Sequence, residues 1–270
     1  MHTPESALAV LFADLGAQYR TIEDEIDASV TRVITESAFV GGPHVAEFER
    51  AFARYCGTKH CVGVANGTDA IFIALKTLGI GSGDEVITAA NTFIATSEAI
   101  TLTGARPVFV DIDPHTYTID VDRIEDRITD RTRAIVPVHL YGQPADMDPI
   151  RRLAQAYGLF VVGDAAQAHG AQYHGLPVST LAHITSYSFY PGKNLGAYGD
   201  AGALVTDNDD WAMRARMIAN HGRTSRYDHD VEGVNSRLDG MQAAILSAKL
   251  PHIHDWTAQR LQAWVKTPRP

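Results

Sequence analysis

Residues 60–111, HCVGVANGTDAIFIALKTLGIGSGDEVITAANTFIATSEAITLTGARPVFVD, show the pattern that determines the fold class. Short apolar runs at 60–65, 85–89 and 107–111 predict strands, and residues 69–78 and 96–103 between them predict helices. Strands that alternate with helices form a mostly parallel sheet covered by helices on both faces. The segment 79–83 resembles a nucleotide-binding loop. It precedes a strand instead of joining a strand to a helix, so we interpret it as a turn.

The alternation continues on both sides of this stretch. Residues 1–59 have helical spacing of apolar residues, interrupted at Gly41-Gly42-Pro43, and residues 148–157 predict a further helix. Additional strands are predicted at 134–140, 159–163, 184–189 and 202–206, which gives seven strands in all. The 270 residues suffice for one large α/β domain, or for one domain and a fragment of a second.

Composition and charge exclude several classes of protein. Hydrophobic residues make up 45% and charged residues 20%, as in an ordinary soluble protein. The net charge of −9, with no long basic run, argues against a nucleic-acid partner. No apolar run is long enough to cross a membrane and no signal peptide is evident, so we expect a cytoplasmic protein. Cys56 and Cys61 fit no disulfide framework or metal pattern, so we expect packed thiols and no metal site.

The first segment with chemistry is Asn66-Gly67-Thr68-Asp69-Ala70, which follows a predicted strand and begins a predicted helix. Gly67 allows the backbone to approach a ligand closely, Thr68 offers a hydroxyl, and the free N–H groups of the first helical turn point to one place. This arrangement predicts a phosphate-binding site. The alternative is a simple capping turn with Thr68 or Asp69 as the cap.

The second segment begins with Asp164, at the carboxyl end of the strand 159–163. A carboxylate there is costly unless it meets a cation, and a protonated pyridine nitrogen would serve. The small residues that follow leave room for a flat ring, and Gln167 is placed to hydrogen-bond a ring substituent. The alternative is that Asp164 caps a following helix.

The third segment is SFYPGKNLG, residues 188–196, in which a strand ends in a Pro/Gly turn that contains Lys193. A partly desolvated lysine can lose its proton and act as a nucleophile. Ser188 could reach a phosphate oxygen. The alternative for Lys193 is a solvated surface lysine.

The three segments together match the needs of pyridoxal phosphate, because groups at strand ends can converge on one pocket. A phosphate site, a carboxylate for the pyridinium and a Schiff-base lysine are what this cofactor requires. Phe93, after another strand, could stack on the ring or belong to the core. His139, at a predicted strand end, could line the pocket or lie in the core. No Ser-His-Asp arrangement with a nucleophile elbow is present.

From about residue 10 to about residue 262 the sequence resembles the DegT/DnrJ family of pyridoxal-phosphate-dependent nucleotide-sugar aminotransferases. Eight blocks in order carry the resemblance: NGTDA (66–70), GDEVI (83–87), TF (92–93), PVFVD (107–111), PVHLYG (137–142), DAAQAHG (164–170), SFYPGKNLG (188–196) and NSRL (235–238). The resemblance implies a fold type I transferase, with a mostly parallel seven-stranded sheet covered by helices on both faces.

The resemblance also implies roles for single residues. Lys193 would hold the cofactor as a Schiff base and transfer the proton, and Asp164 would keep the ring nitrogen protonated. The other cofactor contacts would be Gly67, Thr68, Phe93, Gln167, Ser188 and, from the second subunit of a homodimer with shared active sites, Asn235. Glutamate would be the amino donor and a nucleotide-linked keto-sugar the acceptor. The stretch Leu140–Pro144 resembles family members that act on 3-keto sugars more than those that act on 4-keto sugars.

The sequence departs from the family pattern at two places. Gly163 stands where the family usually has an acidic residue, and we expect a modest effect because Asp164 is kept. The likeness fades near Arg260, and the tail contains two prolines. We therefore expect a large cofactor-binding domain at 1–250, a truncated start of the small C-terminal domain at 251–270, and most of that small domain to be missing. The alternatives are a cofactor-binding remnant with little turnover and a non-enzymatic regulatory or interaction protein. The dehydratase branch of the family has histidine in place of the lysine, and Lys193 argues against it.

Overall fold

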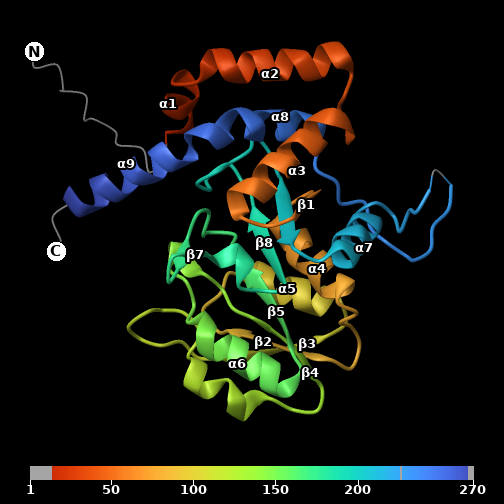
Figure 1. Ribbon diagram of the computed structural model, residues 1–270, viewed down its shortest axis with the longest axis vertical. Coiled ribbons are helices and arrows are strands. Elements are labelled where there is room, and N and C mark those ends of the chain that lie inside the picture. The colour runs from red at the N-terminus through yellow and green to blue at the C-terminus, as the bar shows by residue number, and fades with distance from the viewer. Residues whose placement is uncertain (1–13, 226, 267–270) are drawn as a thin grey trace, which may run out of the picture.

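The computed structural model describes residues 14–225 and 227–266 (Figure 1). Its centre is a seven-stranded sheet, which confirms the predicted number of strands. In spatial order the strands are β1 (His60–Val64), β9 (Gly202–Thr206), β8 (Ile184–Ser188), β5 (Phe160–Asp164), β4 (Thr132–Val136), β2 (Glu85–Ala89) and β3 (Arg106–Val110). Strand β9 is antiparallel to both of its neighbours and every other pair is parallel, so the sheet is mostly parallel as predicted.

The strands alternate their side chains between two apolar cores. Val62, Val162 and Leu204 point into one core, whereas Cys61 and Val161 point to the opposite face. Helices cover the first face: α4 (Gly67–Thr77), α5 (Ile94–Leu102) and α7 (Asp209–Ala219). The second face is covered by α3 (Gly42–Cys56), α6 (Met147–Tyr157) and α8 (Gly240–Lys249). The predicted three-layer arrangement is therefore confirmed.

Three more helices lie outside these layers (Figure 1). Helix α2 (Glu23–Glu36), preceded by the short α1 (Leu15–Arg20), packs on the outer side of α8 through Ile22, Ile26 and Ile245. Helix α9 (Ile253–Lys266) continues from the α8 region and extends away from the sheet. The helical prediction for 1–59 is confirmed where it can be compared; its first 13 residues, like residues 267–270, lie outside the described part of the chain.

The remaining elements are short. Strands β6 (Gln172–Tyr173) and β7 (Leu176–Pro177) form a separate two-stranded sheet. The 3-10 helices are η1 (Val121–Arg123), η2 (Glu125–Arg127), η3 (Leu140–Gly142), η4 (Val178–Thr180) and η5 (Leu250–His252). The strand predicted at 134–140 ends earlier, at Val136, because the chain turns into η3, where Tyr141 adopts a left-handed conformation with φ of 53°.

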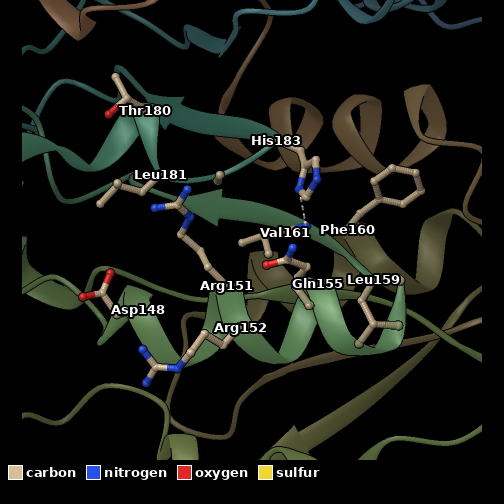
Figure 2. Close-up of a pocket in the computed structure, with 13 residues that line it drawn as sticks. Asp148, Arg151, Arg152, Gln155, Leu159, Phe160, Val161, Thr180, Leu181 and His183 are labelled. Atoms are coloured by element: carbon tan, nitrogen blue, oxygen red, sulfur yellow. Dashed lines mark hydrogen bonds between the residues drawn. The ribbon is translucent and has the colours of Figure 1, made fainter.

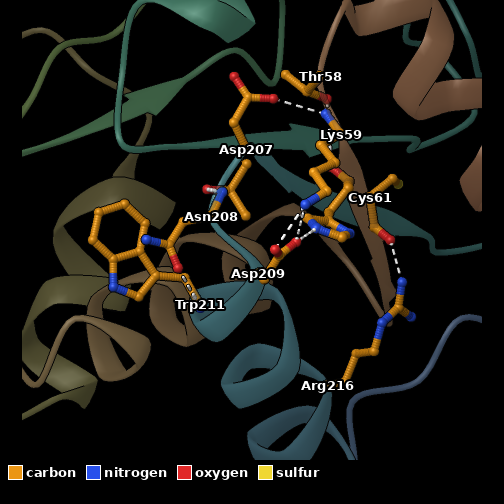
Figure 3. Close-up of polar contacts among 10 residues, drawn as sticks. Thr58, Lys59, Cys61, Asp207, Asn208, Asp209, Trp211 and Arg216 are labelled. Atoms are coloured by element: carbon orange, nitrogen blue, oxygen red, sulfur yellow. Dashed lines mark hydrogen bonds and ion pairs between the residues drawn. The ribbon is translucent and has the colours of Figure 1, made fainter.

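Polar contacts fix the beginning of β1 to the connection between β9 and α7 (Figure 3). The backbone N–H of Lys59 donates to Asp207 at 2.7 Å, and the Lys59 ammonium pairs with Asp209. Deeper in the molecule, Arg216 of α7 donates to the Cys61 carbonyl and to the buried carboxylate of Glu49, both at 2.6 Å. These contacts stabilise the edge strand of the sheet, since β9 is its only strand partner among the described residues.

Both cysteines are buried and unpaired, as expected for packed thiols. Burial raises the pKa of Cys56 to about 12 and that of Cys61 well above its ordinary value. Among residues 14–225 and 227–266, no helix combines the length and apolar character needed to cross a membrane. In the same part of the chain, no three His, Cys, Asp or Glu side chains are grouped closely enough to hold a metal ion.

Candidate active site

A cavity of about 430 Å³ lies at the carboxyl edge of the parallel strands. It is bounded by the segments that follow β1, β2, β4, β5 and β8, which confirms that the strand-end groups converge. Seven of the eight residues predicted for the site line it: Gly67, Thr68, Phe93, Asp164, Gln167, Ser188 and Lys193. Ligands in open α/β sheets bind at this edge, so the cavity is the candidate active site.

The amino end of α4 forms one wall of the cavity. Asn66 caps the helix, because its side-chain oxygen accepts a hydrogen bond from the Asp69 N–H at 2.8 Å. The alternative in which Thr68 or Asp69 is the cap is therefore wrong, and the Thr68 side chain is left to the cavity. The first-turn N–H groups and the helix dipole favour an anion here.

Two glycines allow this wall to approach the sheet closely. A Cβ on Gly67 would lie 2.6 Å from the Cβ of Ser188, so only a glycine lets α4 begin against β8. A Cβ on Gly202, the first residue of β9, would lie 2.3 Å from the Asn66 carbonyl oxygen. The cup formed by Gly67, Thr68 and Ser188 is therefore supported from behind by β9, a contribution that the sequence analysis missed.

Asp164 lies at the end of β5 and is 6% exposed. Its carboxylate accepts hydrogen bonds from the Thr96 hydroxyl at 2.8 Å and from the Ala166 N–H at 3.1 Å. Burial raises its pKa, while Thr96, Ala166 and the charge of Lys193 oppose this shift. No helix follows Asp164, so the helix-cap alternative is wrong. None of the described Lys, Arg or His side chains forms an ion pair with Asp164, and the residue lines the cavity.

Lys193 lies in the loop between β8 and β9 and is half-buried. The loop is closed by the Lys193 N–H, which donates to the Tyr190 carbonyl at 2.8 Å. Burial lowers the pKa of the Lys193 ammonium, and the negative charge of Asp164 opposes this. The surface-lysine alternative is therefore wrong, and an amine with a lowered pKa is more readily available as a nucleophile and base.

The remaining predicted residues differ in their placement. The Gln167 side-chain oxygen accepts a hydrogen bond from the Tyr141 N–H at 3.0 Å, which fixes the side chain at the cavity wall. Phe93 is 67% exposed and lines the cavity. His139 is fully buried and does not line it; burial lowers its pKa to about 4, so the core alternative holds. Asn235 is exposed, lies outside the cavity and forms a backbone bridge with Asn220.

Besides Gly202, sequence reasoning missed Thr96, Tyr190 and Asp200, all of which belong to this site. Thr96 is 1% exposed, and its hydroxyl connects Asp164 with Thr92. A threonine that faces inward on a short helix after a strand end was the available signal, but its partner is distant in sequence.

A larger cavity, of about 710 Å³, lies between α6 and the amino ends of β5 and β8 (Figure 2). Arg151, Gln155 and His183 lie on its walls, and the His183 ring accepts a hydrogen bond from the Val161 N–H at 2.9 Å. It contains no lysine and no strand-end carboxylate. It is also at the opposite edge of the sheet from the one where ligands of such folds bind.

Comparisons with known proteins show the family of the chain. The model of the DegT/DnrJ/EryC1/StrS aminotransferase family matches residues 20–267. A pleiotropic regulatory protein of Geobacillus stearothermophilus is 51% identical over 92% of this chain and 66% of its own length. The UDP-2-acetamido-2-deoxy-3-oxo-D-glucuronate aminotransferase of Pseudomonas aeruginosa is 49% identical over 92% of this chain and 69% of its own length.

Among solved structures, S. venezuelae DesV in complex with a ketimine intermediate superposes with a TM-score of 0.92. The two sequences are 48% identical, and the superposition covers 94% of this chain and 68% of the DesV chain. This chain therefore spans about two thirds of the length of the proteins it matches.

Proposed function

The chain belongs to the DegT/DnrJ/EryC1/StrS aminotransferase family, and we propose that it binds pyridoxal phosphate and moves an amino group from glutamate to a nucleotide-linked keto-sugar. The observation that carries the proposal is the meeting of Asp164, Lys193 and the Gly67–Ser188 cup around one cavity. These groups come from three different strand ends, and a chance meeting of the three chemistries is improbable.

The residues present fit the cofactor. The first-turn N–H groups of α4 and the hydroxyls of Thr68 and Ser188 would hold the phosphate, in a cup that a Cβ on Gly67 would fill. Asp164 would pair with the protonated ring nitrogen, which supplies the cation that this buried carboxylate lacks. Phe93 and Gln167 would contact the ring. When bound, pyridoxal phosphate supplies an electron sink for the carbon from which a proton is removed.

The chain's own residues provide the proton chemistry. The lowered pKa of Lys193 favours its neutral amine, so its Nζ would hold the cofactor and, when free, would accept and return a proton. Thr96 holds the Asp164 carboxylate at Oδ2 and stabilises its charged form. A charged Asp164 in turn keeps a ring nitrogen protonated.

Substrate, assembly and domain division are further parts of the proposal. A 3-keto sugar is supported by the Leu140–Pro144 stretch beside the cavity and by the name of the Pseudomonas relative, which acts on a 3-oxo sugar. We propose a homodimer in which Asn235 reaches the phosphate of the partner's site; its exposure outside its own cavity supports this role. We also propose that the cofactor-binding domain ends near residue 250 and that α9 begins the small C-terminal domain.

An absorbance spectrum of the purified protein tests the function. Added pyridoxal phosphate should give a band above 400 nm that Lys193→Ala abolishes, and glutamate should bleach it. A band that glutamate leaves unchanged would favour the cofactor-binding remnant. No band in a folded dimer would refute the cofactor proposal and leave the regulatory role, which the name of the Geobacillus relative suggests for that protein.

A further inference from the structure

Lys249, the last residue of α8, is 1% exposed. The proposed function gives this buried lysine no role. Its ammonium donates a hydrogen bond to the Gly196 carbonyl at 2.7 Å and lies 4.1 Å from the centre of the Tyr198 ring. Within the described part of the chain no carboxylate pairs with it. The ammonium is thus satisfied by a backbone carbonyl and an aromatic face.

Within the connection between β8 and β9, Gly196 ends the turn of residues 190–196 that carries Lys193. A Cβ on Gly196 would lie 2.3 Å from the Pro191 carbonyl oxygen, so the two ends of the loop touch. The Ala197 N–H donates to the Phe189 carbonyl at 2.8 Å and closes the base of the loop. A hydrogen bond that fixes the Gly196 carbonyl therefore restrains the closed turn that contains Lys193.

Helix α8 also holds the residues just after the loop. The Tyr198 N–H donates to the side-chain oxygen of Gln242 at 2.9 Å. Two residues of α8, Gln242 and Lys249, therefore hydrogen-bond the backbone at the end of the loop. From α9, Arg260 hydrogen-bonds Asn194, the neighbour of Lys193. Donors and acceptors of α8 and α9 therefore bind three residues of this region, Asn194, Gly196 and Tyr198.

Packing alone does not require a charge at residue 249. A methionine would fill nearly the same volume without the cost of burying a cation. Burial lowers the pKa of Lys249 to about 8, so the ammonium is mostly protonated at neutral pH. A charged donor binds a carbonyl more strongly than a neutral one, which is the property this loop uses.

We propose that Lys249 is a positioning residue that holds the Gly196 carbonyl and so keeps Lys193 half-buried at the cavity. The proposal rests on the function proposed for Lys193. In this proposal α8 covers the sheet and also positions the amine of Lys193.

Two measurements on the cofactor-free protein test this with Lys249→Met. Hydrogen–deuterium exchange of peptides covering residues 190–198 should become about tenfold faster or more, because the loop opens locally. The midpoint of the pH profile of Lys193 acetylation, followed by mass spectrometry, should move to higher pH, because a hydrated ammonium regains its ordinary pKa. Ile245→Ala, on the same helix but facing α2, is the control for loss of stability and should change neither.

Unchanged exchange at 190–198, an unchanged acetylation profile, or equal changes in Ile245→Ala would overturn the proposal. If Lys249→Met does not fold, Lys249→Gln carries the same test, since its shorter side chain cannot reach Gly196; wild-type exchange in that variant would also overturn it. Neither measurement involves the cofactor, so a failure of pyridoxal phosphate to bind would be seen separately.

Discussion

Replacement of Thr96 by valine tests the environment of Asp164 most directly. The substitution removes the hydroxyl that donates to Asp164 at 2.8 Å and keeps the shape of the side chain. A hydrogen bond to a charged group contributes about 1.5–3 kcal/mol, and a neutral one about 0.5–1.5 kcal/mol. Both residues are buried, so no water replaces the lost donor freely. We expect Thr96→Val to lower the free energy of unfolding by about 2 kcal/mol at pH 7.5.

The effect should depend on pH in a defined direction. Asp164 has a folded-state pKa above its ordinary value, so its contribution to stability is fully present below that ordinary value and is lost as pH rises through the folded-state pKa. Thr96 lowers this pKa, and its removal raises it further, which enlarges the loss at high pH. At pH 3.5, where Asp164 is neutral, the substitution should cost about 1 kcal/mol, the value of a neutral hydrogen bond.

Urea unfolding of the cofactor-free protein, followed by circular dichroism at both pH values, measures these differences. The same substitution in an Asp164→Asn background completes a double-mutant cycle and should cost about 1 kcal/mol at either pH. The reasoning is refuted if Thr96→Val costs the same, within about 0.5 kcal/mol, in both backgrounds at pH 7.5.

Two further substitutions test the support of the site and of the sheet edge. Gly202→Ala, whose Cβ would lie 2.3 Å from the Asn66 carbonyl oxygen, should cost about 1–3 kcal/mol in thermal unfolding and weaken cofactor binding. Gly192→Ala, whose Cβ meets nothing closer than 3.8 Å, should stay within about 0.5 kcal/mol, and equal effects would contradict the steric explanation. Arg216→Ala should cost about 2 kcal/mol in urea unfolding, because it leaves the buried carboxylate of Glu49 without its cation. Adding Glu49→Gln should recover part of that loss, and a double variant no more stable than Arg216→Ala would show that the buried charge is not the cause.

The strands and seven of the residues that line the cavity could be predicted because both leave local signals. Each strand is a short run of apolar residues; Asp164 is the last residue of such a run, and Lys193 lies in the Pro/Gly turn that follows another. Helices α7 and α8 were not assigned, and neither was the direction of β9. A run such as GALVT at 202–206 is apolar in either orientation, so its antiparallel pairing depends on the connection and the neighbours.

The supporting residues of the site could not be predicted, because their partners are distant in sequence. The contact between Gly202 and Asn66 exists only because β9 lies beside β1. The hydrogen bond from Thr96 to Asp164 likewise joins helix α5 to the end of β5, two elements that no local pattern relates. Local periodicity specifies which residues are buried, whereas these contacts follow from the order of strands in the sheet.

That order of strands also has a consequence for synthesis on the ribosome. Strand β1 emerges early, yet in the part of the chain that the structure describes it pairs with β9 alone, about 140 residues later. At about 5–20 residues per second, β1 waits on the order of ten seconds for that partner. The cup at Gly67 is supported by Gly202, so a nascent chain that lacks β9 cannot present the complete cup that we propose for the phosphate. Capture of the proposed cofactor would therefore be a late event in the life of each new molecule, and the unpaired edge of β1 is open to chaperones or to aggregation until then.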